Sequence, residues 1–181
     1  MTCAAPKLLL HVCCGPCATA VIERLAPDYR VTLYWFNPNI QPREEYEARL
    51  EAARTLAADL EMSMVEEGGG EEEFAELARG LEDLPEGGKR CRRCYELRLR
   101  RAADCAARSG CTHLATTLTV SPHKPAEAIN ELGSHLADEY GLEFVAEDFK
   151  QQGGFQRSVE LSRVHGLYRQ KYCGCLASQR R

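Results

Sequence analysis

The sequence predicts an α/β fold, a doubly wound parallel sheet of about five strands. Three observations predict it. Short apolar runs alternate with longer segments of helical periodicity. Cysteines and polar residues follow the ends of several runs, which is where a parallel sheet binds its ligands. The 181 residues suffice for one substantial core and are too few for two comfortable domains, so we expect a single domain over residues 1–181.

The first half of the chain repeats a strand, a turn and a helix three times. The predicted strands are an apolar run at 8–12, a β-branched and aromatic run at 30–36, and a weaker run at 62–65. The runs are followed by segments that contain glycine, proline or asparagine, residues typical of turns. Strong helix formers with apolar residues at helical spacing then predict helices at 18–25, 44–60 and 71–79.

The second half adds two strands and three helices. Residues 91–108 predict a cysteine-containing helical insertion that Gly110 ends. A threonine-rich run at 113–120 predicts the fourth strand, and a helix at 125–140 has proline in its first turn. A fifth strand is expected at 142–146, and a C-terminal helical segment at 155–168.

The composition favours a soluble, cytoplasmic protein. No apolar run approaches the roughly 20 residues that cross a bilayer, and the N-terminus lacks the basic-then-apolar pattern of a signal peptide. We therefore expect no membrane association and no export. In a reducing compartment, clusters among the ten cysteines are more often metal ligands or redox groups than structural bridges. Cys105 and Cys111, in and just after an alanine-rich helix, are expected to pack as small apolar residues.

The net charge of −4 is unevenly distributed. Residues 1–80 hold 7 basic and 14 acidic side chains, whereas residues 81–181 hold 16 basic and 13 acidic ones. The positive half therefore contains the candidates for binding phosphates of a nucleic acid, which are Arg90, Arg92, Arg93, Arg98, Lys150, Arg169 and Lys171. A solvated helix face explains the arginines of residues 90–101 equally well, so this pattern alone does not establish RNA binding.

Two cysteine groups predict a metal centre. Cys91 and Cys94 open a helix, and Cys13 and Cys14 lie at the end of the first strand, where ligands bind. Four thiolates hold either zinc or a [4Fe-4S] cluster. Adjacent cysteines strain a site for a single tetrahedral ion, whereas a cluster offers separate irons, so the cluster is favoured. Cys17 is an optional ligand whose alternative role is packing at the helix start.

Further strand-end residues suggest chemistry beside that centre. His123 is a candidate proton donor, and Lys124 a candidate ligand for phosphate or a developing oxyanion. Asp148 and Lys150 follow the fifth strand in the same way. A second iron beside the cluster, held by Cys17 with His123 or Asp148, is a further alternative.

Cys173-Gly-Cys175 is a different kind of motif. A disulfide across one residue closes a small, strained ring, and Gly174 supplies the backbone freedom that such a ring needs. Strained disulfides are easily reduced and tend to be redox-active. Metal binding by the pair, or two idle thiols, remain as alternatives.

Five motifs in this order closely resemble the epoxyqueuosine reductase QueH family. They are His11-Val-Cys-Cys-Gly-Pro-Cys17, Arg90-Cys-x-x-Cys-Tyr-x-x-Arg-Leu99, Thr116-Thr-Leu-Thr-x-Ser-Pro-His-Lys124, Asp148-Phe-Lys150 and Leu167-Tyr-Arg-Gln-Lys-Tyr-Cys-Gly-Cys175. The resemblance implies a Rossmann-like or PP-loop-like fold. It also implies that Cys13, Cys14, Cys91 and Cys94 bind the cluster and that Cys173 and Cys175 form a redox-active disulfide.

The resemblance further implies a cytoplasmic oxidoreductase of tRNA modification. Its substrate would be tRNA carrying epoxyqueuosine, whose epoxide is reduced to give queuosine in the last biosynthetic step, without cobalamin. Such a reduction needs two electrons and two protons, and the sequence does not identify the electron donor. Two alternatives are a nucleotide-binding, tRNA-modifying enzyme of the PP-loop type and a zinc-stabilised RNA-binding module. The first turn lacks the glycine- and serine-rich phosphate loop that the former needs.

Overall fold

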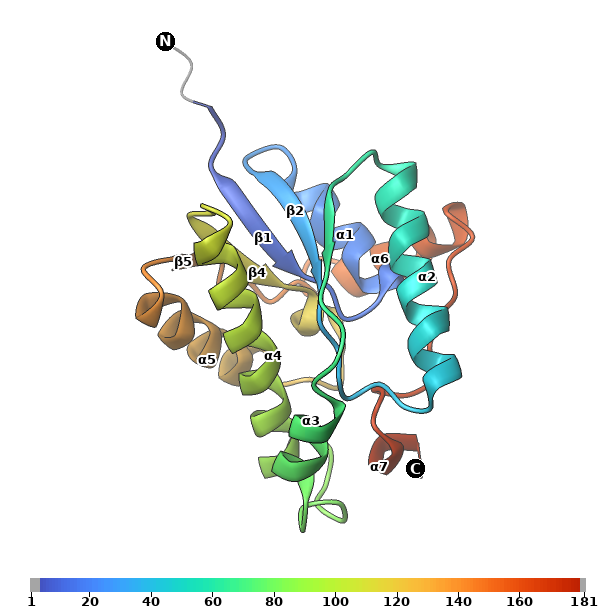
Figure 1. The fold of residues 1–181 in the computed structure, drawn as a ribbon. Coiled ribbons are helices and arrows are strands. Elements are labelled where there is room, and N and C mark those ends of the chain that lie inside the picture. Colours follow the sequence, from blue (N-terminus) through green and yellow to red (C-terminus); the bar gives the residue numbers. More distant parts are fainter. Residues whose placement is uncertain (1–3, 180–181) are drawn as a thin grey trace.

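The computed structural model describes residues 4–179 and contains a five-stranded parallel sheet with helices on both faces (Figure 1). The strand order is β3-β2-β1-β4-β5. The strands are β1 (Lys7–His11), β2 (Arg30–Trp35), β3 (Met64–Glu66), β4 (His113–Thr116) and β5 (Glu143–Phe144). The helices are α1 (Gly15–Leu25), α2 (Arg43–Asp59), α3 (Glu71–Ala78), α4 (Lys89–Arg108), α5 (Ala126–Glu139), α6 (Gly154–Val164) and α7 (Leu176–Gln179). This confirms the predicted doubly wound fold class.

Alternating side chains of the central strands build two hydrophobic layers. Leu8 and Leu10 of β1 point into the core beneath α1 and α2, which also includes Trp35 of β2. Leu9 points to the opposite face and packs in the core that includes Ala102 of α4. This two-residue alternation buries both faces of β1, as a strand at the centre of a parallel sheet requires. Figure 1 shows α1, α2 and α6 on one side of the sheet and α4 and α5 on the other.

The strand order places a ligand-binding crevice between β1 and β4. β1 pairs with β2 on one side and with β4 on the other, so the chain connections leave these central strands in opposite directions. Such a switch point is where doubly wound sheets bind ligands, beyond the carboxyl ends of the strands. The backbone N–H of Cys13, after β1, donates a hydrogen bond of 3.0 Å to Thr117 Oγ1, after β4. The fold therefore joins the first cysteine group to the threonine-rich segment.

The predicted fourth strand is wrong in its second half. β4 ends at Thr116, and residues Thr117–Val120 form a 3-10 helix instead. Thr116 Oγ1 accepts a hydrogen bond from Leu118 N–H, which caps this turn. The threonine hydroxyls thus bond locally and to the cysteine turn, although β-branched residues favour a strand. The fifth strand is also shorter than predicted, with only Glu143–Phe144.

The C-terminal helix ends earlier than predicted. α6 stops at Val164, and the chain then crosses the carboxyl edge of the sheet without regular structure before the short helix α7, which the sequence did not predict. Within residues 4–179, no helix is both long enough and apolar enough to cross a membrane.

Candidate active site at the carboxyl edge of the sheet

Three cysteines gather at the turn between β1 and α1. The Sγ atoms of Cys13, Cys14 and Cys17 all lie within 4.8 Å of one another, an arrangement that fits a metal ion. Cys14 is the N-cap of α1, and its Sγ accepts a hydrogen bond of 3.4 Å from Cys17 N–H. Gly15 makes the turn possible, because a Cβ there would lie 2.6 Å from the carbonyl oxygen of Ala52 in α2. The structure thus gives Cys17 a central place that the sequence left optional.

The three thiols differ in their electrostatic environment. Hydrogen bonds from Cys14 and Cys17, helped by the positive charges of Lys124 and Arg98, hold the pKa of Cys13 well below its usual range. Burial raises the pKa of Cys14 to about 12. The hydrogen bond to Cys13 raises the pKa of Cys17 well above its usual range. Cys13 is therefore the thiol of this group that loses its proton most readily, as expected for a cysteine that presents a thiolate to a metal.

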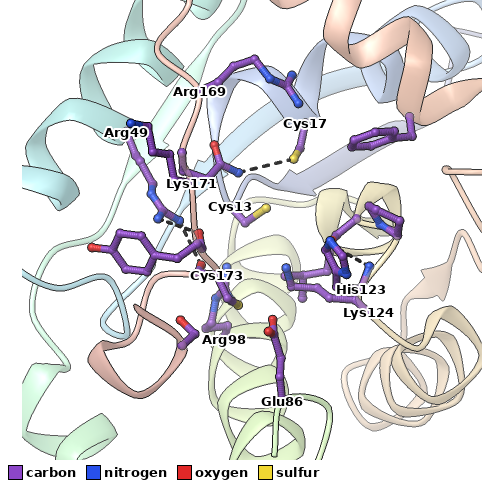
Figure 2. Close-up of a pocket in the computed structure, with 17 residues that line it drawn as sticks. Cys13, Cys17, Arg49, Glu86, Arg98, His123, Lys124, Arg169, Lys171 and Cys173 are labelled. Carbon is purple, nitrogen blue, oxygen red and sulfur yellow. Dashed lines mark hydrogen bonds between the residues drawn. The ribbon is translucent and has the colours of Figure 1, made fainter. Parts of the chain in front are cut away.

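A cavity of about 340 Å³ opens beside these thiols (Figure 2). Cys13, Cys17 and Cys173 line it, so the C-terminal cysteine motif reaches the same space as the first cysteine group. Its cationic lining residues are Arg49, Arg98, Lys124, Arg169 and Lys171, with His123 at the exposed side. Glu86 is the only carboxylate among the described lining residues. The cavity is therefore strongly basic and suits an anionic ligand.

Two of these cations lie within reach of the sulfur atoms. Arg98 is 2% exposed and donates a hydrogen bond of 2.5 Å from Nη2 to Asn37 Oδ1. Burial opposes its charge, but the sulfurs of Cys94 and Cys13 raise its pKa further above the ordinary value. Burial also opposes the charge of Lys124, yet the sulfurs of Cys173 and Cys13 raise its pKa as well. Both side chains therefore stay charged beside the thiols.

Cys91 and Cys94 are buried on the first two turns of α4. Cys91 belongs to a hydrophobic cluster against which Cys13 packs, and Cys94 to one against which Cys175 packs. Burial raises the pKa of Cys94 to about 12. Arg98 interacts electrostatically with both Cys94 and Cys13, so its charge links the two cysteine groups. Cys91 and Cys94 do not belong to the compact group of three thiols.

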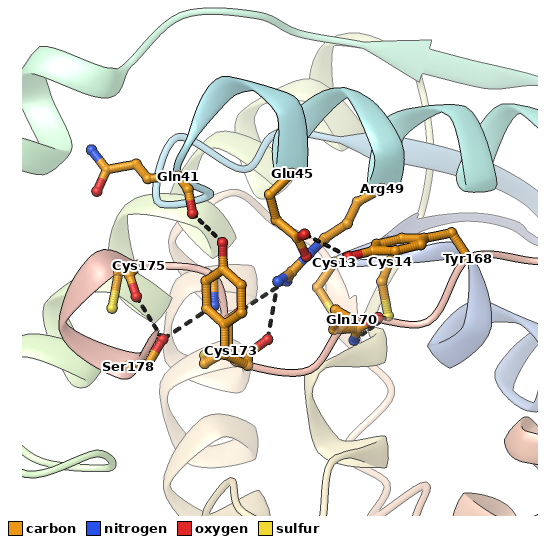
Figure 3. A network of polar contacts seen from close by, with 12 residues as sticks. Cys13, Cys14, Gln41, Glu45, Arg49, Tyr168, Gln170, Cys173, Cys175 and Ser178 are labelled. Carbon is orange, nitrogen blue, oxygen red and sulfur yellow. Dashed lines mark hydrogen bonds and ion pairs between the residues drawn. The ribbon is translucent and has the colours of Figure 1, made fainter. Parts of the chain in front are cut away.

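A polar network fixes the C-terminal segment over the cavity (Figure 3). Arg49 of α2, 2% exposed, donates hydrogen bonds to the carbonyl oxygens of Cys173 (2.9 Å) and Tyr172 (3.0 Å). Its Nε bonds Glu45 Oε1 at 2.7 Å, and Glu45 Oε2 accepts a hydrogen bond of 2.6 Å from the Tyr168 hydroxyl. Arg49 carries no signal in the sequence, because a helical arginine four residues after a glutamate is usually a surface ion pair.

Cys173 and Cys175 are free thiols here, as are all nine cysteines of the described residues. Burial raises the pKa of Cys173. Gly174 has a φ of 141°, and a Cβ at this position would lie 2.9 Å from Asn39 Nδ2, so glycine is needed between the two cysteines. The redox-active disulfide between them stays a prediction.

Several predicted site residues do not line the cavity, among them Arg90, Asp148, Lys150 and Cys175. Arg90 is 2% exposed and its Nη1 donates to the carbonyl oxygens of Leu81, Glu82 and Leu84, so it holds the loop before α4 instead of offering its charge to a phosphate. Asp148 and Lys150 form an ion pair of 2.8 Å with each other and do not line the cavity. Cys175 does not line it either.

Other predicted phosphate ligands lie on the surface. Arg92 and Arg93 are exposed on α4, although Arg93 Nη1 also donates to Leu77 O at 3.2 Å. Lys171 is exposed at the cavity, and Arg169 beside it is tied to Ser162 Oγ at 3.1 Å. Gln170, between them, contacts the thiols and was not predicted. Its position inside the C-terminal motif is the only sequence signal that could have found it.

The fold and site together define a parallel α/β protein with a cysteine-rich, basic cavity at the switch point of its sheet. A family model described as "Epoxyqueuosine reductase QueH" matches residues 8–181. A relative named epoxyqueuosine reductase QueH from Streptococcus pyogenes is 37% identical over 177 residues, covering 94% of this chain and 69% of that protein. One with the same name from Thermotoga maritima is 36% identical over 174 residues, covering 94% and 89%. The chain belongs to the QueH family.

Proposed function

We propose that this protein is an epoxyqueuosine reductase, which reduces the epoxide of epoxyqueuosine in tRNA to give queuosine. Membership of the QueH family carries this assignment. The basic, sulfur-lined cavity supports it, because the reaction needs redox groups beside a site that accepts an anionic polynucleotide. We further propose that the enzyme acts in the cytoplasm as a single iron–sulfur domain and without cobalamin.

The residues at this edge of the sheet fit a sulfur-ligated metal centre. Three thiols gather within 4.8 Å, and one of them has a depressed pKa, which favours the thiolate that binds iron. Cys13, Cys14, Cys91 and Cys94 would hold a [4Fe-4S] cluster, and Cys17 would hold a second iron beside it. When bound, a cluster supplies one-electron transfer to the site. The buried charge of Arg98 compensates the negative charge of these cysteines.

Two electrons and two protons convert the epoxide to the alkene and release its oxygen as water. Oxidation of the Cys173 and Cys175 thiols to a disulfide supplies both electrons and both protons, and an external donor then restores the dithiol. The Lys124 ammonium donates a hydrogen bond to the epoxide oxygen as negative charge develops on it. His123, at the exposed side of the cavity, relays one of these two protons to the same oxygen. Asp148 has no role in this scheme, because it pairs with Lys150 outside the cavity.

The alternative of a nucleotide at the first turn is disfavoured by its structure. A phosphate at a helix N-terminus needs free backbone N–H groups, but Cys14 Sγ already accepts the N–H of Cys17. The close approach of Gly15 to α2 leaves no room on that side of the turn. These contacts favour sulfur ligands over a nucleotide at this turn.

Anaerobic turnover of tRNA bearing the epoxide tests the proposal. The reconstituted protein should contain iron and sulfide and should convert the epoxide to queuosine over many turnovers, measured by mass spectrometry of the nucleosides. Cys173→Ser should abolish multiple turnover, because serine cannot form the disulfide.

Cys111→Ser is the matched control, since Cys111 lies near the start of β4 and does not line the cavity. It should leave turnover unchanged. Unchanged multiple turnover by Cys173→Ser would disprove the dithiol step, and a colourless wild-type protein loaded with zinc would disprove the redox centre.

A further inference from the structure

Gln170 places its amide between the cysteine turn and the cavity. It lies in the segment between α6 and α7 and is half-buried. Its Nε2 is 3.0 Å from Cys14 Sγ and 3.9 Å from Cys17 Sγ (Figure 3). Gln170 also lines the cavity. Gln170 therefore connects the C-terminal motif to the cysteine turn at the wall of the cavity.

The nitrogen of this amide is a donor to sulfur. A cysteine sulfur accepts hydrogen bonds, most strongly as the thiolate that ligates a metal, and only the NH₂ end of the glutamine amide can supply them. Cys14 Sγ also accepts the backbone N–H of Cys17, so it receives two N–H donors. Hydrogen bonds to the sulfur ligands of an iron–sulfur cluster stabilise its more negative, reduced form and so raise the reduction potential.

The oxygen of the same amide has no such partner. Gln170 Oε1 is buried and accepts no hydrogen bond from any described residue. A buried acceptor without a partner is destabilising, which makes it a candidate contact for a ligand. The cavity is lined mostly by donors, such as Lys124, Arg98 and Lys171. Gln170 lines the same cavity, so a ligand that carries donor groups of its own can satisfy its unpartnered Oε1.

We infer that Gln170 is a positioning and specificity residue with two functions. Its N–H groups hold the sulfurs of Cys14 and Cys17, and its Oε1 accepts a hydrogen bond from an O–H or N–H group of the substrate. This inference rests on the proposed function, because the substrate it names is the epoxide-bearing group of the tRNA. The amide of Gln170 would then contact the substrate and the cysteine turn at the same time.

Two substitutions separate the functions. Gln170→Leu removes both the donor and the acceptor, whereas Gln170→Glu removes the N–H groups and keeps an acceptor. Gln156→Leu is the matched control, because Gln156 is exposed on α6. The measurements are the reduction potential of the reconstituted protein without tRNA, and kcat and KM for tRNA bearing the epoxide. If Gln170→Leu does not fold, Gln170→Met, which is similar in length and lacks the amide, replaces it.

Both Gln170 variants should have a lower reduction potential than wild type and the control. KM should rise about tenfold in Gln170→Leu and less than about threefold in Gln170→Glu. An unchanged potential in Gln170→Leu would overturn the donor function, and an unchanged KM would overturn the acceptor function. A wild-type protein that does not reduce the epoxide would contradict the proposed function alone, because the potential reports on the sulfur contacts without substrate.

Discussion

Two arginines of this site are equally buried but serve different ends. Arg49 and Arg98 are each 2% exposed. Arg49 is satisfied by Glu45 and by two backbone carbonyls, so its charge fixes the course of the chain. Arg98 donates a hydrogen bond to Asn37 Oδ1 and interacts with the sulfur of Cys94, and its buried Nε has no partner among the described residues. Its charge therefore remains directed at the cysteine sulfurs. The same residue type at the same depth is structural in one case and electrostatic in the other.

The network of Arg49 predicts a large effect on stability. Arg49→Ala should lower the free energy of unfolding by about 3–5 kcal/mol, because it leaves the carboxylate of Glu45, whose side chain is only 11% exposed, without its cationic partner. Arg49→Lys keeps the charge but cannot bond two carbonyls and Glu45 together, and should cost about 1–3 kcal/mol. Urea denaturation of the metal-free protein measures both values.

Arg43→Ala is the control in the same helix. Arg43 also pairs with a glutamate four residues away, Glu47, but their side chains are 70% and 46% exposed. Its loss should cost less than about 1 kcal/mol. Equal losses of unfolding free energy for Arg43→Ala and Arg49→Ala would show that the hydrogen bonds from Arg49 to Tyr172 and Cys173 contribute nothing to stability.

At the residue level, the sequence predicts which side chains are reactive better than it predicts their burial and their partners. Cys13, Cys17 and Lys124 meet at the cavity because strand ends of a parallel sheet converge, and this can be inferred from the alternation of strands and helices. Burial of a charge cannot be inferred in this way. Arg90 was assigned to phosphate from local charge density, but it binds carbonyls of a loop that is formed only in the tertiary structure.

At the element level, the helical insertion depends on that same arginine. α4 carries Cys91 and Cys94 in its first two turns, and the loop that precedes it is tied to the helix by Arg90. No side-chain hydrogen bond from a described residue caps the N-terminus of α4. The hydrogen bonds from Arg90 to the preceding loop therefore help to determine where the helix begins. The positions of both cysteines follow from that start.

We therefore expect Arg90→Met to lower stability by about 1–3 kcal/mol and to reduce the iron content after reconstitution. Its effect on tRNA affinity should be no larger than its loss of metal explains. Arg92→Met, on the exposed face of the same turn, should leave stability within about 0.5 kcal/mol of wild type. Chemical denaturation and iron assay test this pair. A stable, fully loaded Arg90→Met protein with weak tRNA binding would restore the original assignment to phosphate.

The sequence predicts the elements except where side-chain hydrogen bonds override the periodicity. The helices α1, α2 and α5 lie close to their expected ranges, because their apolar spacing is regular. Residues 117–120 have the composition of a strand, yet they turn because Thr117 Oγ1 bonds the sulfur of Cys13 at 3.3 Å. That bond joins residues 104 positions apart, and no local pattern contains it.

At the level of the whole molecule, the protein is negatively charged but its cavity is positively charged. The protein has a net charge of −4, but the cavity at the carboxyl edge of the sheet is lined by five Lys and Arg side chains and one described carboxylate. A nearby tRNA would be repelled by much of the surface and attracted at this edge. The direction of approach would then follow from electrostatics before any base is recognised, and it would lead the modified nucleotide toward the sulfur atoms.

Lys171 offers the clearest test of this arrangement, because it is exposed at the cavity and does not belong to the polar network of Arg49. If it contacts one phosphate, Lys171→Gln should reduce the slope of log affinity against log salt by about 0.7 to 0.9 and weaken binding of tRNA at low salt most. Lys7→Gln is the matched control, since Lys7 is exposed at the first residue of β1, at the opposite edge of the sheet. Fluorescence anisotropy at several salt concentrations measures both slopes. Equal slopes for the two variants would place the tRNA elsewhere on the protein. Salt screens charges that are far from the bound tRNA, so a distant lysine has little effect on the slope.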